Sequence, residues 1–221
     1  MRKLFSVAVL TLAWAGMSCA ASAGELVDRM VAAVNGKVIL QSDWDQAVCY
    51  QALVDGRAPA DVSAKERQAS LDQLIDLELL RQQMPMADFQ RATPQEAREQ
   101  LVKIRGHEDE PKGISSCGMT EKELESHAAL QLNVLRLVDS RLRASVHVDA
   151  RSIEDYYRDQ FLPELEKNGA QPVSLAQVTP KIKEVLTQQK INQALGNWLA
   201  SLRSSSSIQS ESLHAMENRT Q

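Results

Sequence analysis

Two short apolar runs separated by Asn-Gly begin the patterned part of the chain. Met30–Val34 and Lys37–Leu40 have the length and composition of strands, and Asn35-Gly36 is a strong signal for a two-residue hairpin turn. Ser42 follows, and serine is a common helix N-cap. The pattern therefore predicts a β-hairpin that leads directly into a helix over residues 43–54.

Three more helices are predicted from apolar residues at helical spacing. Each begins with Ser or Thr followed three residues later by Glu, which is the capping-box pattern. The pairs are Ser63 with Glu66, Thr93 with Glu96, and Thr120 with Glu123. The helices over about 63–84 and 120–142 are apolar over much of their girth, which is typical of helices that pack on two sides in a bundle.

The C-terminal part is predicted to hold two further helices. Ser152 begins a short one that ends at Asn168-Gly169, and Thr179-Pro180 begins a long amphipathic one. The apolar segment Val173–Val178 between them is expected to be extended. Residues 204–221 are rich in serine and polar side chains, which predicts a disordered tail.

The first residues are typical of an export signal. Arg2 and Lys3 precede an apolar run over residues 4–17, and Ala21-Ser22-Ala23 is a small-residue cleavage site. We therefore expect a signal peptide cleaved after Ala23. An uncleaved membrane anchor and lipidation at Cys19 are alternatives, although the run is short for a bilayer and Gly16-Met17-Ser18 lacks the usual leucine.

Charge and cysteine content narrow the function classes. The 221-residue chain has a net charge of −4, and loss of Arg2 and Lys3 would leave 23 basic against 29 acidic residues, a net −6. This argues against nucleic-acid partners and against binding to anionic lipid. Cys49 and Cys117 would remain after cleavage, and in an exported protein they form either one disulfide or two free thiols.

The sequence carries no recognisable catalytic or cofactor motif. Nucleotide-binding glycine loops, serine-hydrolase elbows and Cys-x-x-Cys pairs are all lacking. The four histidines have no partner at metal-ligand spacing, and the run His107-Glu108-Asp109-Glu110 is interpreted as a solvated acidic loop. We therefore expect no metal, no ATP or other cofactor, and no catalytic residue.

Apolar surface is the remaining candidate for function. Methionine suits surfaces that adapt to varied partners, and wide apolar helix faces can leave a groove for another chain. The candidate peptide-binding residues are those that one core face is not expected to bury: Met84, Met86, Leu130 and Val134.

The segment V-A-A-V-N-G-K-V-I-L-Q-S-D over residues 31–43 resembles the opening of the N-terminal domain of SurA-type periplasmic chaperones. Residues 71–80, 178–186 and 197–202 are similar to later helices of that domain, so the resemblance covers most of residues 26–203. It implies a mainly α fold with a small β-hairpin near the N-terminus and a long C-terminal helix that packs back on it. It also implies that Val173–Val178 pairs with the hairpin or lies beside it.

The functional implication of the resemblance is ATP-independent binding of unfolded polypeptides in the periplasm. The clients would be outer-membrane protein precursors, bound in an apolar groove without stable membrane insertion. The domain organisation would be a first helical part over 24–145, a connector over 146–171, and a closing strand and helix over 172–203 that complete the same domain.

One departure from the family limits what the resemblance implies. SurA carries parvulin-type prolyl isomerase domains between these parts, whereas the connector over 146–171 is too short for an independent domain of at least about 50 residues. Two alternatives stay open. Tyr156, Tyr157 and Phe161, with His147 nearby, could line the proline pocket of a degenerate isomerase, or exchange of the closing helix between two copies could give a domain-swapped homodimer.

Overall fold

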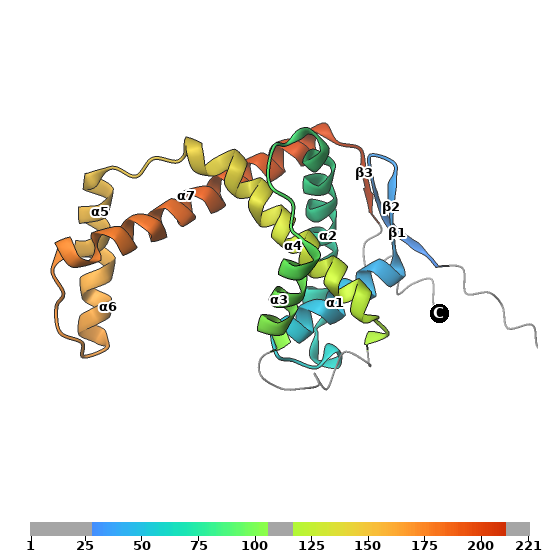
Figure 1. Cartoon of the computed structure of the whole chain (residues 1–221), viewed down its shortest axis with the longest axis horizontal. Helices are drawn as coiled ribbons and strands as arrows, with labels where there is room; N and C mark the ends of the chain where they lie inside the picture. The colour runs from blue at the N-terminus through green and yellow to red at the C-terminus, as the bar shows by residue number, and fades with distance from the viewer. Residues whose placement is uncertain (1–27, 106–116, 211–221) are drawn as a thin grey trace, which may run out of the picture.

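A computed structural model of the chain describes residues 28–105 and 117–210. Within these ranges the structure is mainly helical, with a small antiparallel sheet near the N-terminus and a long C-terminal helix that contacts earlier helices (Figure 1). The expected signal peptide, the acidic run His107-Glu108-Asp109-Glu110 and the last eleven residues of the expected tail lie outside the described residues.

The hairpin predicted from Asn-Gly is confirmed. Strands β1 (Met30–Val34) and β2 (Lys37–Leu40) pair antiparallel, with Val34 opposite Lys37. Asn35 and Gly36 have φ angles of 51° and 81°. Two consecutive positive φ values are what a type I′ hairpin turn requires, and Asn and Gly tolerate them better than other residues.

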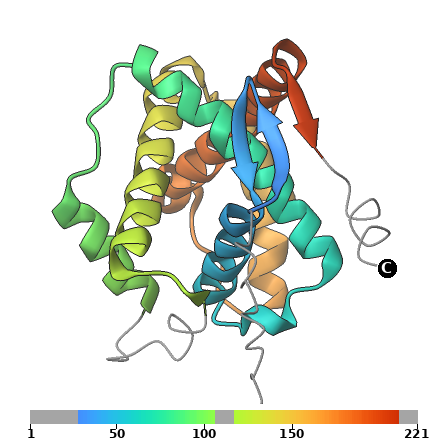
Figure 2. The same ribbon diagram turned by 90° about the vertical axis from the view of Figure 1, so that its right-hand side faces the viewer.

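The third strand of the sheet is not the segment that the sequence predicted. Strand β3 (Ile208–Ser210) pairs antiparallel with β1, so the order is β2-β1-β3 (Figure 2). The pairing of Val173–Val178 with the hairpin is wrong, and so is disorder of residues 204–210. Ile208 is half-buried and packs against the central core. The serine-rich composition of residues 204–210 does not indicate this apolar contact.

The C-terminal helix α7 (Leu175–Ser205) begins earlier than predicted and takes in most of the segment expected to be a strand. Pro180 therefore lies inside the helix instead of at its start. The Thr179 hydroxyl donates to the Leu175 carbonyl (2.7 Å), so the polar group of the residue before the proline is satisfied within the first turns. Pro180 is the sixth residue of the helix and has no N–H, so α7 lacks one i→i−4 hydrogen bond at this point.

Two predicted helix starts are also corrected, the one with Ser42 as N-cap and the one at Ser152. Helix α1 (Gln41–Val54) begins before Ser42, and the Asp43 carboxylate accepts a hydrogen bond from the Leu40 N–H (2.9 Å). Helix α5 (Ala150–Tyr156) is capped by Asp149, whose carboxylate accepts from the Ser152 N–H (2.8 Å). In both cases the serine lies in the first turn, and its own N–H donates to an aspartate: Ser42 to Asp28 (3.2 Å) and Ser152 to Asp149.

The three capping boxes are confirmed. They begin α2 (Ala64–Gln83), α3 (Pro94–Arg105) and α4 (Glu121–Leu142). Short 3₁₀ turns join or extend the helices: η1 (Pro59–Asp61), η2 (Met84–Met86) and η4 (Arg143–Ser145).

The central core contains residues from both ends of the chain. Its fully buried members come from the sheet, α1 and α2 and include Val34, Trp44 and Leu71. Leu202 from α7 and Ile208 from β3 pack against them. The expected contact of the long C-terminal helix with the earlier helices is therefore confirmed, and β3 makes the strand contact.

The remaining helices form an arm that projects from this body (Figure 1). Helix α5 is followed by a π-helical turn, η5 (Tyr157–Phe161), and by α6 (Leu162–Lys167). They lie beside the N-terminal half of α7, and Ile153 and Ile182 are the buried residues of the two sides.

Candidate functional site

A groove follows helix α2 on the side facing β2, α1 and α4. It consists of three adjoining hollows, the largest of which encloses about 1300 Å³ when the open solvent above it is included. We call it the α2 groove. The residues that α2 contributes include Ser70, Gln73, Leu74, Leu77, Glu78 and Arg81.

The hollows adjoin one another, because neighbours share lining residues. Leu77 and Leu130 line both the largest hollow and a second one, which we call the middle hollow. Gln73 lines both the middle hollow and the third hollow. Along α2 the groove extends from Glu66 to Arg81, which at 1.5 Å per residue is about 22 Å. An extended peptide rises about 3.3 Å per residue, so roughly six or seven residues would fit.

The floor of the groove is apolar although α2 also supplies the core. Leu71, Ile75 and Leu79 are fully buried and face the sheet and α1. Leu74 and Leu77 lie on the neighbouring face and are only half-buried. The apolar side chains of α2 therefore fall into two sets, one that packs in the core and one that lines the groove.

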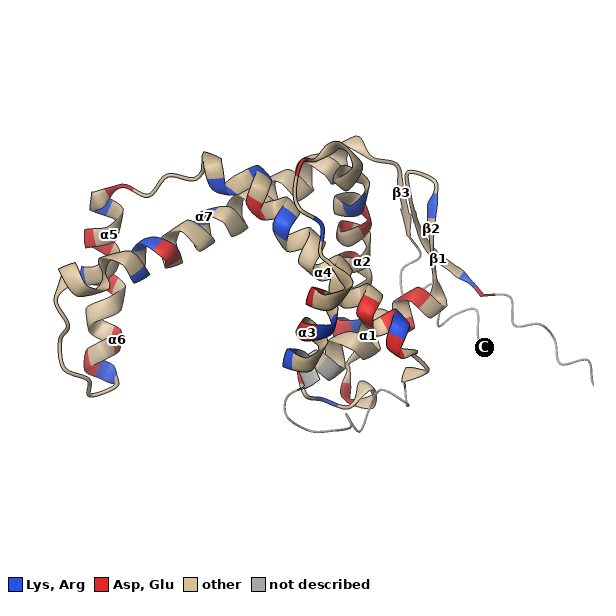
Figure 3. Ribbon diagram, in the orientation of Figure 1, with Lys and Arg blue, Asp and Glu red and all other residues tan. Residues whose placement is uncertain are grey.

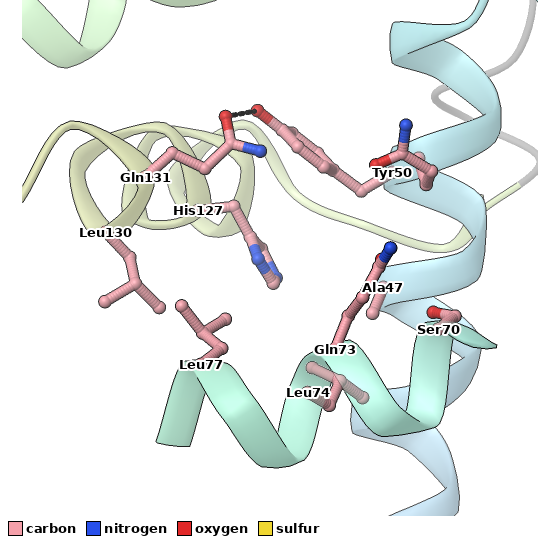
Figure 4. Close-up of a pocket in the computed structure, with 10 residues that line it drawn as sticks. Ala47, Tyr50, Ser70, Gln73, Leu74, Leu77, His127, Leu130 and Gln131 are labelled. Atoms are coloured by element: carbon pink, nitrogen blue, oxygen red, sulfur yellow. Dashed lines mark hydrogen bonds between the residues drawn. The ribbon is translucent and has the colours of Figure 1, made fainter. Parts of the chain in front are cut away.

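One wall of the groove is a small aromatic and amide cluster between α1 and α4. The Tyr50 hydroxyl donates to Gln131 Oε1 (3.0 Å), and the Tyr50 ring stacks on His127 with ring centroids 5.4 Å apart (Figure 4). Burial lowers the pKa of His127 and raises the pKa of Tyr50. Both side chains are therefore uncharged at neutral pH.

Charges are confined to the two ends of the groove. Arg57 binds Glu66 (2.9 Å) at one end, and Arg81 binds Glu78 (2.6 Å) at the other. The middle hollow is lined only by uncharged side chains, among them Gln73, Leu77 and Gln131. This arrangement suits an uncharged stretch of polypeptide, because apolar side chains can meet the leucines while glutamine amides offer both donors and acceptors.

The sequence-predicted binding residues are placed in different surroundings. Leu130 lines the groove. Met84 is buried with Leu80 and Leu137, and Val134 packs against that cluster. Met86 is 78% exposed on η2, and it does not line the α2 groove. The structure thus brings one of the four to the groove, and peptide binding by any of them stays a prediction.

Several groove residues were not singled out from the sequence. Leu74 and Leu77 could have been found, because α2 carries more leucines than one core face can bury. Tyr50, His127 and Gln131 could not, since a stacked ring pair between two helices 77 residues apart along the chain leaves no spacing signal.

Cys49 and Cys117 form a disulfide, the first of the two alternatives that the sequence left open. The bond joins α1 to the segment that precedes α4. Cys117 also packs against the cluster that contains Tyr50, so the cross-link lies behind the wall of the α2 groove. A disulfide is typical of an oxidising compartment.

The aromatic residues of the arm make packing contacts. Tyr157 stacks on Phe161 with ring centroids 5.9 Å apart, and its hydroxyl donates to the Val173 carbonyl (2.7 Å). The His147 carbonyl accepts from Lys190 Nζ (2.6 Å). The Lys190 contact ties the connector to α7, and the Tyr157 hydroxyl ties η5 to the segment just before α7.

Two other kinds of site were sought in the described ranges. Among residues 28–105 and 117–210 there is no cluster of three or more His, Cys, Asp or Glu side chains that could hold a metal ion. Across the same ranges, none of the helices has the length and apolar character needed to cross a bilayer. Basic and acidic residues are interspersed along the described helices (Figure 3).

Comparison with protein-family models and with curated proteins finds no match to this chain. Its function is therefore inferred from the α2 groove and its surroundings. The groove offers apolar side chains along α2, uncharged hydrogen-bonding groups in its middle hollow and charged residues at its ends.

Proposed function

We propose that this protein is an ATP-independent periplasmic chaperone that holds unfolded outer-membrane polypeptides in the α2 groove. The observation that carries the proposal is the uncharged middle of the groove, where Leu74, Leu77 and Leu130 are half-buried beside glutamine side chains. Exposed apolar grooves on folded proteins commonly mark binding sites.

The mechanism requires only binding. A protein that binds the unfolded chain lowers its free concentration and so slows aggregation, which depends steeply on that concentration. The apolar floor would take up side chains of the client, and the amides of Gln73 and Gln131 would exchange hydrogen bonds with its backbone. No nucleotide is needed for this exchange.

The similarity to SurA-type chaperones supports the same proposal. The hairpin that leads into α1 and the closing helix α7 that returns to the first helices are the features that the resemblance implies. The arm formed by α5, η5 and α6 stands where that family carries its isomerase domains, so we propose the chaperone activity without the isomerase activity.

The periplasmic location has two supports. The disulfide between Cys49 and Cys117 is of a kind that persists in oxidising compartments. The N-terminal pattern of Arg2, Lys3 and an apolar run is that of an export signal.

The experiment is suppression of aggregation. An outer-membrane β-barrel protein unfolded in urea is diluted into buffer with increasing amounts of the mature chain, and light scattering is followed without ATP. We expect suppression that saturates near a fixed molar ratio. Absence of suppression by protein shown to be folded by circular dichroism would contradict the proposal.

Matched variants locate the activity. Leu77→Gln places a polar side chain on the floor of the groove, whereas Leu135→Gln makes the same change at a residue of α4 that is 64% exposed and does not line the groove. We expect Leu77→Gln to need several-fold more protein for equal suppression and Leu135→Gln to behave as wild type. Equal effects of the two would place the binding surface elsewhere.

A further inference from the structure

Strand β2 is an edge of the sheet, and its outer side faces the α2 groove. Among the described residues, the strand order β2-β1-β3 leaves β2 paired on one side only. All four of its residues, Lys37–Leu40, line the largest hollow together with Leu74, Leu77 and Leu130. An unpaired strand edge is a template for another strand, and here it borders the apolar floor of the groove.

The register shows which backbone groups are free for such pairing. Val34 pairs with Lys37 across the two-residue turn, so these two residues exchange hydrogen bonds with each other. Backbone groups alternate in direction along a strand, so the N–H and C=O of Val38 point away from β1. The Leu40 N–H is already taken by the Asp43 carboxylate. Val38 is therefore the residue of β2 that offers a donor and an acceptor to the groove.

The side chains of a strand added here would meet the floor of the groove. Ile39 is 6% exposed and belongs to the core cluster with Leu71 and Ile75, so this face of the sheet lies against α2. A strand added next to β2 continues that face, and every second side chain would point toward α2. Leu77 and Leu130 approach each other across this space (Figure 4).

The charges at this end favour an acidic residue in the added strand. Glu78 binds Arg81 (2.6 Å) and Gln82 (2.8 Å), so the Arg81 charge is neutralised. Asp43 also lines the hollow, and its carboxylate already accepts from the Leu40 N–H. Lys37 makes no ion pair in the described part of the chain. It lies on the α2-facing side of β2, opposite Val34, at the mouth of the hollow.

We propose that β2 binds an extended client segment as a fourth strand of the sheet, paired through the backbone of Val38. The segment carries apolar residues at alternate positions, which contact Leu74, Leu77 and Leu130, and an acidic residue that reaches Lys37. This inference rests on the proposed function and adds the way in which the client is held. Backbone pairing explains how one groove can accept many sequences with alternating apolar residues.

The test compares two substitutions at the same residue. Val38→Pro removes the outward N–H without touching the hydrogen bonds to β1, and proline is tolerated on an edge strand whose N–H faces outward. Val38→Ala shortens the same side chain and keeps the N–H. The probe is a fluorescein-labelled eight-residue peptide of alternating Leu and Thr with one Asp near its end, and the readout is fluorescence anisotropy.

We expect Val38→Pro to weaken peptide binding by about tenfold, since a lost backbone hydrogen bond leaves its partner unsatisfied. Val38→Ala should stay within about twofold of wild type, the size expected for a small change of side chain. A peptide N-methylated at the residue that pairs with Val38 should bind wild type as weakly as the unmodified peptide binds Val38→Pro. Circular dichroism and denaturant midpoints establish that both variants are folded.

The outcomes separate this inference from the proposed function. Equal affinities of the two Val38 variants, with clear binding by wild type, would overturn strand pairing and leave the groove as the binding surface. No binding of the peptide by wild type, together with no suppression of aggregation, would overturn both.

Discussion

Asn35 and Ser207 exchange two hydrogen bonds across 172 residues of chain. The Asn35 N–H donates to the Ser207 carbonyl (2.8 Å), and the Ser207 N–H donates to Asn35 Oδ1 (2.9 Å). The Asn35 amide also donates to Gln82 Oε1 (2.8 Å) at the end of α2. The hairpin turn therefore connects the segment that follows α7 to the end of α2 through hydrogen bonds.

We expect loss of this side chain to loosen the C-terminal segment. Asn35→Gly keeps a residue that accepts a φ of 51° but removes the side-chain hydrogen bonds. The side chain bonds Gln82, Ser206 and Ser207, and at about 0.5–1.5 kcal/mol for each bond the free energy of unfolding should fall by about 1.5–4.5 kcal/mol. Denaturant unfolding measures the change, and limited proteolysis should cut first near β3.

A second substitution separates the side chain from the backbone conformation. Asn35→Ala loses the same hydrogen bonds and also forces a Cβ-bearing residue without a polar side chain into the left-handed region, which costs about 1 kcal/mol more. If both variants were as stable as wild type, the Asn35–Ser207 connection would not contribute to closing the fold.

Local signals in the sequence predicted most of the helices and the hairpin. Asn35-Gly36 defined the turn, and the Ser63, Thr93 and Thr120 capping boxes defined three helix starts, because these patterns act over two to four residues. The third strand was not predictable in this way. Ile208 is held by contacts with residues far along the chain, which no local pattern encodes.

The binding surface was predictable only in part. Leu130 was selected from the width of an apolar helix face, and it lines the groove. Met84 was selected on the same ground and is buried in a cluster that Leu199 of α7 joins. Apolar periodicity indicates that a side chain is buried against other residues. It does not indicate whether those residues belong to the same chain or to a partner.

Reduction of the disulfide should destabilise the body of the protein. Cys49 and Cys117 are 68 residues apart, and closing a loop of that length in the unfolded chain corresponds to about 4 kcal/mol in the chain-entropy model. We expect the Cys49→Ser/Cys117→Ser double variant to lose about 2–4 kcal/mol of unfolding free energy.

The control for this prediction is the reductant itself. Wild type in dithiothreitol should unfold at the same denaturant concentration as the double variant, and the variant should not respond to the reductant. Identical midpoints for wild type with and without reductant would mean that the bond adds no stability.

Acid should weaken the contact between α3 and α4. The Arg136 guanidinium, 2.5 Å from Glu96 Oε1, and then the Thr93 N–H lower the pKa of Glu96 to about 2. The unfolded-state pKa is about 4.3. Because the folded-state value is lower, this contribution to stability is present above about pH 4.5 and is lost as the pH falls toward about 2.

Glu96→Gln removes the titrating group from this contact. Between pH 5 and pH 2.5 its unfolding free energy should fall less steeply than that of wild type, as measured by denaturant unfolding at each pH. Glu154→Gln is the matched control, because Glu154 is exposed and makes no ion pair within the described residues. Equal slopes for wild type and Glu96→Gln would show that Arg136 does not act on this carboxylate.

The closing helix is expected to stay within its own chain. α7 packs against α2 and α4 of the same chain, and Arg203 Nε donates to Asp76 Oδ1 (2.6 Å). We therefore expect multi-angle light scattering of the mature chain to give the mass of a monomer. A mass of two chains that falls to one when Arg203→Ala is introduced would favour exchange of α7 between copies.

The central claim is that unfolded polypeptide occupies the α2 groove, and site-specific photo-crosslinking tests it most directly. A photoreactive amino acid is placed at Leu77 on the groove floor, at Met86 on η2, or at Leu135 on the exposed face of α4, and each protein is mixed with an unfolded outer-membrane β-barrel protein. We predict strong crosslinks from Leu77 and weak ones from Met86 and Leu135. Crosslinks that are equal at all three positions, or stronger at the exposed positions than at Leu77, would contradict binding in the groove.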